Sequence, residues 1–193
     1  AVYFGLDRFN ARMRADNFTR DDLAALVPFL HERGVRAYVT MNVLIFPAEM
    51  AEALEYVDCL DSAGVDGVIV QDMGLAALIA GHRKAGRWSI ELHISTQMTV
   101  SSPEAVRLVD ELFDPQQIVL SRELSLKEIA EKVAQGIGRN TLANVERINS
   151  NRYMYNLDCF LFLGNLKLYA RFDKSRFERI LRNTPNNHQK ELM

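Results

Sequence analysis

Short apolar runs alternate with longer amphipathic stretches over the first 135 residues of the chain. Runs of this length are typical of buried β-strands, and the stretches between them have the spacing of apolar residues that a helix requires. The strands predicted in this way are Val2–Gly5, Arg36–Asn42, Gly67–Asp72, Ser89–Ser95 and Gln117–Glu123. Strand and helix alternate at the spacing of a βα unit. The pattern therefore predicts about five βα units with parallel strands.

Signals for helix starts and stops occur between these strands. The predicted starts are Thr19 before an acidic first turn, Ser102 before Pro103, and the capping box Ser125–Glu128. Gly34 and Gly64 follow helical stretches and precede strands, where a glycine can take the left-handed conformation that ends a helix. These signals place the helices between the strands.

The two faces of the predicted strands differ in polarity. In Arg36–Asn42, the residues Ala37, Val39 and Met41 form an apolar face, and Tyr38, Thr40 and Asn42 lie on the other. Ser89–Ser95 shows the same alternation, with Glu91, His93 and Ser95 on the polar face. An open sheet buried between two layers of helices would be apolar on both faces, so the alternation favours a (β/α) barrel with a polar interior. We therefore expect an α/β fold, a partial TIM-like barrel.

The pattern changes after residue 135, which divides the chain into two predicted parts, 1–135 and 136–193. The second part has two apolar runs, 159–163 and 166–172, separated by Gly164-Asn165. A two-residue turn of this kind joins antiparallel strands, so a β-hairpin is predicted, followed by a short basic helix over Lys174–Arg182. This C-terminal hairpin and helix have a different character from the βα units.

Composition supports a globular chain and shows an uneven distribution of charge. Of 193 residues, 48% are hydrophobic, but no apolar run is long enough to span a bilayer, so no membrane association is expected. Residues 1–135 contain 13 basic and 20 acidic side chains, a net charge of −7, whereas residues 136–193 contain 10 and 5, a net charge of +5. The charge changes sign where the pattern changes.

Polar side chains gather at the ends of the predicted strands, which is where the active sites of (β/α) barrels lie. Asp72 and Glu123 are candidates for a general base and His93 for an acid/base group or a metal ligand. Arg122 has the planar guanidinium that binds carboxylate or phosphate. The predicted catalytic residues are Asp72, His93 and Glu123, and the predicted substrate-binding residues are Asn42, Gln71, Gln97 and Arg122; no residue is assigned to a metal. Pairing of Arg122 and Glu123 with neighbouring strands is the structural alternative.

Basic residues of the C-terminal part form a second candidate site. Arg171, Lys174 and Arg176 lie beside aromatic residues and could contact an RNA backbone. A solvated helix face is the alternative for the same residues. The chain has two cysteines, Cys59 and Cys159, far apart in sequence, which fits a reducing compartment and a cytoplasmic location. Two cysteines are too few for an iron–sulfur cluster, which four thiolates usually hold, so no cofactor is expected in this chain.

Seven short motifs occur in order along the first part of the chain. They are AVYFGL at 1–6, FNAR at 9–12, DNFT at 16–19, YVTMN at 38–42, VIVQD at 68–72, HISTQM at 93–98 and LSRELS at 120–125. Together they resemble the N-terminal part of the collagenase-like peptidase family over residues 1 to about 134. The resemblance implies a TIM-like barrel whose first strand and helix would precede Ala1.

The resemblance implies two chemistries. The family is named for a collagenase-like peptidase activity. Its members are also known as oxygen-independent hydroxylation proteins that act on ribosomal or transfer RNA bases or on quinone precursors, with a cysteine-ligated iron–sulfur cluster. The motifs are similar to those of the RNA-directed branch, but the cysteine signature of the family has no matching positions in this chain. Three interpretations stay open: an enzyme of the family acting on RNA or peptide, a non-catalytic barrel fragment that associates with itself through open sheet edges, and an RNA-binding module.

Overall fold

A computed structural model describes residues 1–121, 124, 141–144, 160–162 and 170–171. Its elements are β1 (Val2–Gly5), α1 (Leu23–His31), β2 (Ala37–Met41), α2 (Met50–Ser62), β3 (Gly67–Val70), α3 (Met73–Lys84), β4 (Glu91–Ile94), a short 3₁₀ helix η1 (Thr96–Met98), α4 (Pro103–Phe113), β5 (Gln117–Val119), β6 (Thr141–Asn144), β7 (Phe160–Phe162) and β8 (Ala170–Arg171). The first five strands lie within the predicted ranges, and the predicted alternation of strand and helix is confirmed.

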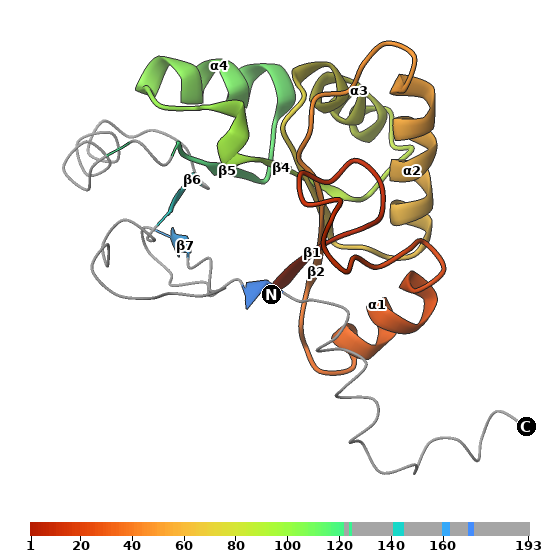
Figure 1. The fold of residues 1–193 in the computed structure, drawn as a ribbon. Helices are drawn as coiled ribbons and strands as arrows, with labels where there is room; N and C mark the ends of the chain where they lie inside the picture. Colours follow the sequence, from red (N-terminus) through yellow and green to blue (C-terminus); the bar gives the residue numbers. More distant parts are fainter. Residues whose placement is uncertain (122–123, 125–140, 145–159, 163–169, 172–193) are drawn as a thin grey trace, which may run out of the picture.

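The strands form one sheet in the order β7-β6-β5-β4-β3-β2-β1-β8. Strands β1 to β6 run parallel, and helices α1 to α4 form an arc around them (Figure 1). Residues paired in a parallel ladder share a face of the sheet, so Tyr3, Tyr38, Gly67 and Glu91 form one row across β1 to β4. A second row on the same face contains Ile69, His93 and Gln117. This arrangement is the predicted partial TIM-like barrel.

The two faces of the sheet pack differently. The outer face of β2 and β4 belongs to the main core, because Val39 and Leu92 are buried among the side chains of the helices. On the inner face, Tyr38 and Val119 form a small separate cluster, with Tyr3 and Ile69 packed against it. The alternation seen in the sequence therefore separates a hydrophobic outer core from an inner face that mixes aromatic and polar side chains.

Three of the predicted helix ends are confirmed, and one is different. The Ser102 hydroxyl accepts the N–H of Ala105 at 3.1 Å, and Gly34 and Gly64 have φ of +64° and +75°. At the first helix, α1 begins at Leu23 and its N-cap residue is Asp22, where Thr19 was predicted. Thr19 is a donor instead, since Asp22 Oδ2 accepts both the Thr19 N–H (2.8 Å) and the Thr19 hydroxyl (3.0 Å). A carboxylate is a stronger acceptor than a hydroxyl. The contact from Asp22 back to the N–H of Thr19 is the one that the acidic residue makes in a capping box.

The predicted hairpin between the last two apolar runs is wrong. β7 pairs antiparallel with β6, with Leu161 opposite Ala143, whereas β8 pairs parallel with β1, with Ala170 opposite Val2. The two strands therefore lie at opposite ends of the sheet. Each pairs with a strand whose backbone N–H and C=O groups would otherwise be unpaired at an edge of the sheet. This pairing outweighs the local turn preference of Gly164-Asn165.

Several other predictions for the C-terminal part lie outside the described residues. These are the capping box Ser125–Glu128, the helix Lys174–Arg182 and the boundary near residue 135, which stays a prediction. Within the part of the chain that the structure describes, no helix combines the length and the apolar character needed to cross a membrane.

Candidate functional site

The polar residues at the carboxyl ends of β2 and β3 hold the loops that follow the strands. Asn42 Oδ1 accepts the N–H of Ala11 at 3.1 Å, and Ala11 belongs to the loop after β1. Asp72 Oδ2 accepts the N–H of Ile45 at 3.3 Å, and Ile45 belongs to the loop after β2. Each side chain thus reaches back to the loop of the preceding βα unit. The loops at this end of the barrel are connected to one another.

Asp72 has a second role at the start of the next helix. Its Oδ1 accepts the N–H of Leu75 at 2.8 Å, so Asp72 is the N-cap of α3. An N-cap carboxylate satisfies a free N–H group of the first helical turn and interacts favourably with the helix dipole. Both carboxylate oxygens of Asp72 are therefore engaged by backbone N–H groups.

The loop between β1 and α1 is organised by a buried amide. Asn10 is 4% exposed; its Nδ2 donates to Asn17 Oδ1 (3.0 Å) and to the carbonyl of Leu6 (3.3 Å), and its Oδ1 accepts the N–H of Arg12 (3.1 Å). Gly5 makes room for this amide, because a Cβ at Gly5 would lie 1.9 Å from Asn10 Nδ2. The sequence identified this segment only as a motif, and the role of Asn10 was not predicted.

His93 is the residue before the last in β4, and its side chain lies on the inner face of the sheet. Its side chain is 2% exposed, and within the ladder His93 pairs with Ile69 and Gln117. His93 Nε2 is 3.0 Å from Glu91 Oε2, and the imidazole lies against the Tyr38 ring with centroids 4.6 Å apart. The predicted acid/base histidine is therefore part of the inner face of the barrel, and its Nε2 already has a carboxylate partner.

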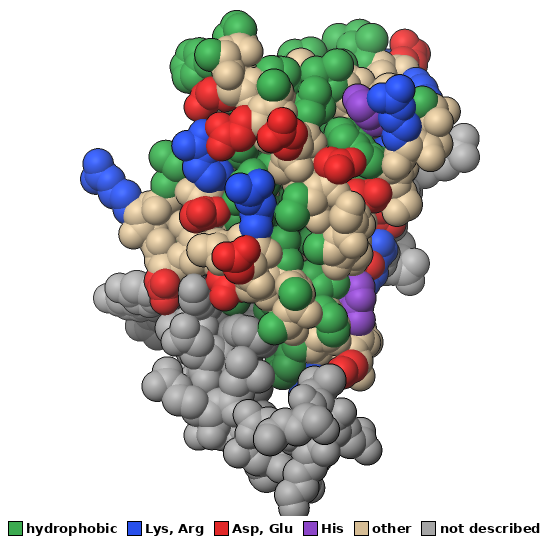
Figure 2. Space-filling model, turned by 90° about the vertical axis from the view of Figure 1, so that its right-hand side faces the viewer, with side chains coloured by type: hydrophobic (Ala, Val, Ile, Leu, Met, Phe, Trp, Pro, Cys, Tyr) green, Lys and Arg blue, Asp and Glu red, His purple; other side chains and the backbone are tan. Residues whose placement is uncertain are grey.

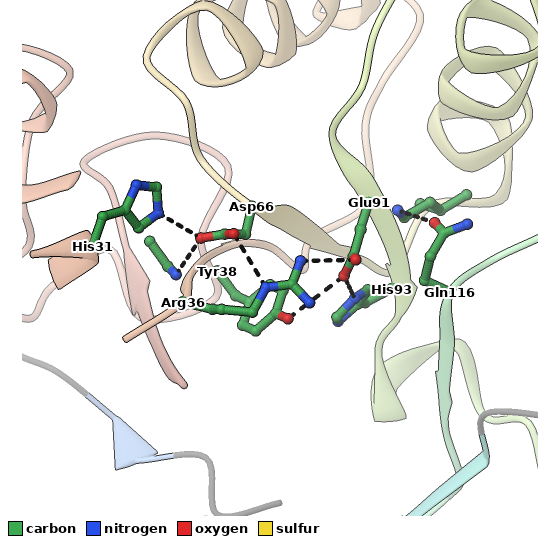
Figure 3. Close-up of polar contacts among 9 residues, drawn as sticks. His31, Arg36, Tyr38, Asp66, Glu91, His93 and Gln116 are labelled. Atoms are coloured by element: carbon green, nitrogen blue, oxygen red, sulfur yellow. Dashed lines mark hydrogen bonds and ion pairs between the residues drawn. The ribbon is translucent and has the colours of Figure 1, made fainter. Parts of the chain in front are cut away.

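Arg36 connects this pair to a second carboxylate at the amino ends of the strands (Figure 3). Its Nη2 is 2.7 Å from Glu91 Oε1, and its Nε donates to Asp66 Oδ1 at 3.1 Å. Asp66 Oδ2 also accepts the N–H of Ala37 at 2.7 Å and lies 2.8 Å from Nε2 of His31. One guanidinium therefore joins the beginnings of β2, β3 and β4. Sequence reasoning missed this network, since its members are distant along the chain.

The network shifts the pKa values of its charged groups. Burial alone would raise the pKa of Glu91, but the hydrogen bonds from His93 and Arg36 outweigh burial and lower the pKa to about 2. Burial would likewise raise the pKa of Asp66, but the Ala37 N–H, His31 and Arg36 lower it. The pKa of Arg36 is raised, because its bonds to the two carboxylates exceed the effect of burial. Both carboxylates are thus held ionised beside the guanidinium.

The remaining predicted site residues have varied positions. Gln71 is partly buried after β3, and Gln97 is exposed on η1, where its N–H donates to the Ser95 hydroxyl at 3.2 Å. Arg171 is part of β8. Arg122, Glu123, Lys174 and Arg176 lie outside the described residues, so their assigned roles stay predictions. The structure brings Asn42 and Asp72 to the carboxyl ends of the strands. It places the His93 side chain on the buried inner face and the network of Arg36, Asp66 and Glu91 at the amino ends.

The donors of this chain do not fit an iron–sulfur cluster. The sequence contains two cysteines, whereas such clusters usually have four thiolate ligands. Cys59 is partly buried on α2, and Cys159 lies outside the described residues. Among the described residues no group of three or more His, Cys, Asp or Glu side chains could hold a metal ion. We derive no step through a cluster.

The sequence matches the family model "Peptidase family U32" over residues 1–148. The chain belongs to peptidase family U32. This match contains all seven motifs, the first five strands of the barrel and the four helices between them. It confirms the family that the motifs indicated.

Two named relatives of this U32 chain carry different functions. A "Collagenase" of Porphyromonas gingivalis is 32% identical over 130 residues, which are 67% of this chain and 30% of the relative. The "23S rRNA 5-hydroxycytidine C2501 synthase" of Escherichia coli is 39% identical over 129 residues, which are 67% of this chain and 18% of the relative. The chain therefore spans less than a third of the length of these two relatives.

A further relative and a solved structure are similar to this chain. The "tRNA hydroxylation protein P1" of Bacillus subtilis is 35% identical over 132 residues, covering 68% of this chain and 30% of the relative. Among solved structures, the U32 peptidase Mk0906 is similar with a TM-score of 0.58 and 16% identity, over 74% of this chain and 59% of that one. At this identity the structural similarity shows the fold alone, which is the barrel described above.

Proposed function

We propose that this U32 chain binds RNA and acts in the hydroxylation of an RNA base. The observation that carries the proposal is the 39% identity to the rRNA 5-hydroxycytidine synthase, which exceeds the 32% identity to the collagenase over a segment of similar length. A relative named for tRNA hydroxylation, at 35% identity, supports the same substrate class. The part assigned to this chain is the binding of RNA, and no redox step is assigned to it.

The carboxyl ends of β1 to β4 are the proposed binding end. This is where barrel enzymes bind their substrates, and here the loops are fixed by Asn42 and Asp72. Gln97 is exposed at the same end, and its carboxamide has both donors and an acceptor for the edge of a base. Glu123 and Arg122 follow β5 in sequence, so we propose them as further residues of this end. A cytoplasmic location follows from the substrate.

Peptidase activity is the second candidate, favoured by the collagenase relative. A serine–histidine–carboxylate arrangement would require the side chains of Ser95, His93 and Asp72 to contact one another. In the structure, Ser95 Oγ accepts the Gln97 N–H, His93 Nε2 pairs with Glu91, and Asp72 is occupied by two backbone N–H groups. These contacts weaken that mechanism for the chain.

Mass spectrometry of nucleosides tests the proposal. RNA from cells with and without the gene for this protein is digested to nucleosides, and modified pyrimidines are compared. We expect one pyrimidine nucleoside with an additional oxygen atom to disappear on deletion and to return when the gene is restored. If the nucleosides are the same with and without the gene, and the purified protein cleaves gelatin, the proposal is overturned in favour of the peptidase.

A further inference from the structure

Large apolar side chains are exposed on three consecutive loops at the proposed binding end. Four of them form what we call the apolar rim: Met13 (61% exposed), Leu44 (61%), Phe46 (66%) and Met73 (51%). Met13 lies in the loop after β1, Leu44 and Phe46 in the loop after β2, and Met73 at the start of α3 after β3. Exposed apolar side chains that recur at one end of a protein indicate an interaction site.

The hydrogen bonds between the loops bring the rim residues near one another. Ile45, between Leu44 and Phe46, donates its N–H to Asp72, and Met73 directly follows Asp72. Ala11, two residues before Met13, donates its N–H to Asn42, the residue after β2. The rim therefore joins three loops whose relative positions are fixed by side-chain-to-backbone bonds.

The residues that carry the rim are held in place by their own loops. The N–H of Phe46 donates to Glu49 Oε2 at 3.1 Å, just before α2 begins. The loop of Met13 is fixed by the buried amide of Asn10. An apolar surface on such fixed loops loses little conformational entropy when it binds a ligand.

Basic side chains lie beside the rim. Arg12 and Arg14 flank Met13 and are both exposed, although the first part of the chain as a whole is acidic. Their loop is joined to the end of β2 by the Ala11–Asn42 bond, and Phe46 lies in the loop that follows β2. Exposed aromatic rings and guanidinium groups on neighbouring loops suit single-stranded nucleic acid, because every base has a face for stacking and every phosphate carries a negative charge. These loops follow the strand ends, so they offer no open strand edge to which a peptide could pair as an added strand.

We propose that the apolar rim binds an unpaired RNA base, with Phe46 as the stacking platform and Arg12 and Arg14 on the adjoining phosphates. The inference rests on the proposed function and adds the residues that recognise the substrate. Figure 2 shows one face of the molecule, where hydrophobic side chains reach the surface between charged ones. Leu108 on α4, which is 52% exposed, lies outside the rim and serves as a matched control.

Binding of a labelled single-stranded oligoribonucleotide to the full chain, measured by fluorescence anisotropy, tests the inference. Phe46→Ala should weaken binding about tenfold, Phe46→Trp should preserve it, and Leu108→Ala should leave it unchanged. A strand of equal charge that lacks bases should bind weakly to the wild type and should not distinguish Phe46→Ala from it. Binding of the complete strand by Phe46→Ala at wild-type strength would overturn the inference while leaving RNA binding intact.

Tryptophan fluorescence and the binding of a gelatin peptide provide two further measurements. The oligoribonucleotide should quench the fluorescence of the new tryptophan in Phe46→Trp, and it should not quench that of the new tryptophan in Leu108→Trp. Trp88, which is 8% exposed, contributes the same background fluorescence to both variants. Absence of quenching in Phe46→Trp overturns the inference even if Phe46→Ala fails to fold. If the wild type binds a gelatin peptide and no RNA, the rim is a peptide site and the proposed function falls with the inference.

Discussion

The side chains of Arg36, the residue before β2, and Glu91, the first residue of β4, meet at 2.7 Å although β3 lies between β2 and β4. Gly67 of β3 lies between Tyr38 and Glu91 in the row across the sheet and has no side chain. A Cβ at Gly67 would lie 2.9 Å from Tyr38 Cδ1 and 3.0 Å from the carbonyl oxygen of Glu91. The glycine thus leaves room for the Tyr38 ring of β2, whose hydroxyl donates to Glu91 Oε2 of β4 at 3.5 Å.

Glu91→Gln should reduce stability and its dependence on pH. The pKa of Glu91 is lowered from 4.5 to about 2 in the folded protein, so its ionised form stabilises the fold above pH 4.5. This contribution is lost as the pH falls toward 2, and by linkage it amounts to at most about 3 kcal/mol. Urea unfolding between pH 7 and pH 3 should show a difference between wild type and Glu91→Gln that shrinks as the pH falls.

Glu104→Gln is the control for this experiment. The Glu104 side chain is 78% exposed and lies 3.6 Å from Arg107, an arrangement that contributes little to stability. Glu104 lies in the first turn of α4, where its charge favours the helix by less than about 1 kcal/mol, so the loss of stability and the change in its pH dependence should be much smaller than for Glu91→Gln. A difference between wild type and Glu91→Gln that is constant from pH 7 to pH 3 would contradict an electrostatic role for Glu91.

Gly67→Ala should destabilise the inner face of the barrel. The added methyl group must displace the Tyr38 ring or the backbone at Glu91, and overpacking of this kind costs about 1–3 kcal/mol. Gly81→Ala on α3 is the control, because nothing lies within 4 Å of its Cβ position and alanine favours a helix. Thermal unfolding should show a lower midpoint for Gly67→Ala and an equal or higher one for Gly81→Ala. Equal midpoints for wild type and Gly67→Ala would refute the close approach.

Local pattern predicted the strands of the barrel and their two faces, because a period of two in strands such as Ala37–Met41 depends only on neighbouring residues. The network of Arg36 could not be predicted in this way. It requires the register that aligns Tyr38, Gly67 and Glu91, and register is a property of strands that are distant in sequence. The partners of β7 and β8 were missed for the same reason.

At the candidate site, the strand-end position of Asp72 was predicted, but its contacts were not. An Asp before an amphipathic helix indicates an N-cap as well as a general base, and the sequence alone does not distinguish the two. The structure adds the bond to Ile45, which connects two loops. Asn10 was not predicted because a buried amide and an exposed one look the same in a sequence.

Purified protein should contain no iron–sulfur cluster. The chain has two cysteines, and one of them, Cys59, is partly buried on α2. Iron and acid-labile sulfide in anaerobically prepared protein should therefore be far below one cluster per chain, and Cys59→Ala should leave both values unchanged. Stoichiometric iron and sulfide that are lost in Cys59→Ala would show that our expectation is wrong.

Asp72→Ala should cost about 1–2 kcal/mol of stability, since it removes the cap of α3 and the acceptor for Ile45. Asp72→Ser should cost less, because the serine hydroxyl can replace the cap but is too short to keep the bond to Ile45. Urea unfolding measures both, and amide hydrogen exchange at Ile45 should be faster in both variants. Asp110→Ala, exposed on α4, is the control and should change neither measurement. If Asp72→Ala unfolds like the wild type and Ile45 exchanges at the wild-type rate, Asp72 does not connect the loops, and its predicted role as a general base becomes the better account of its position.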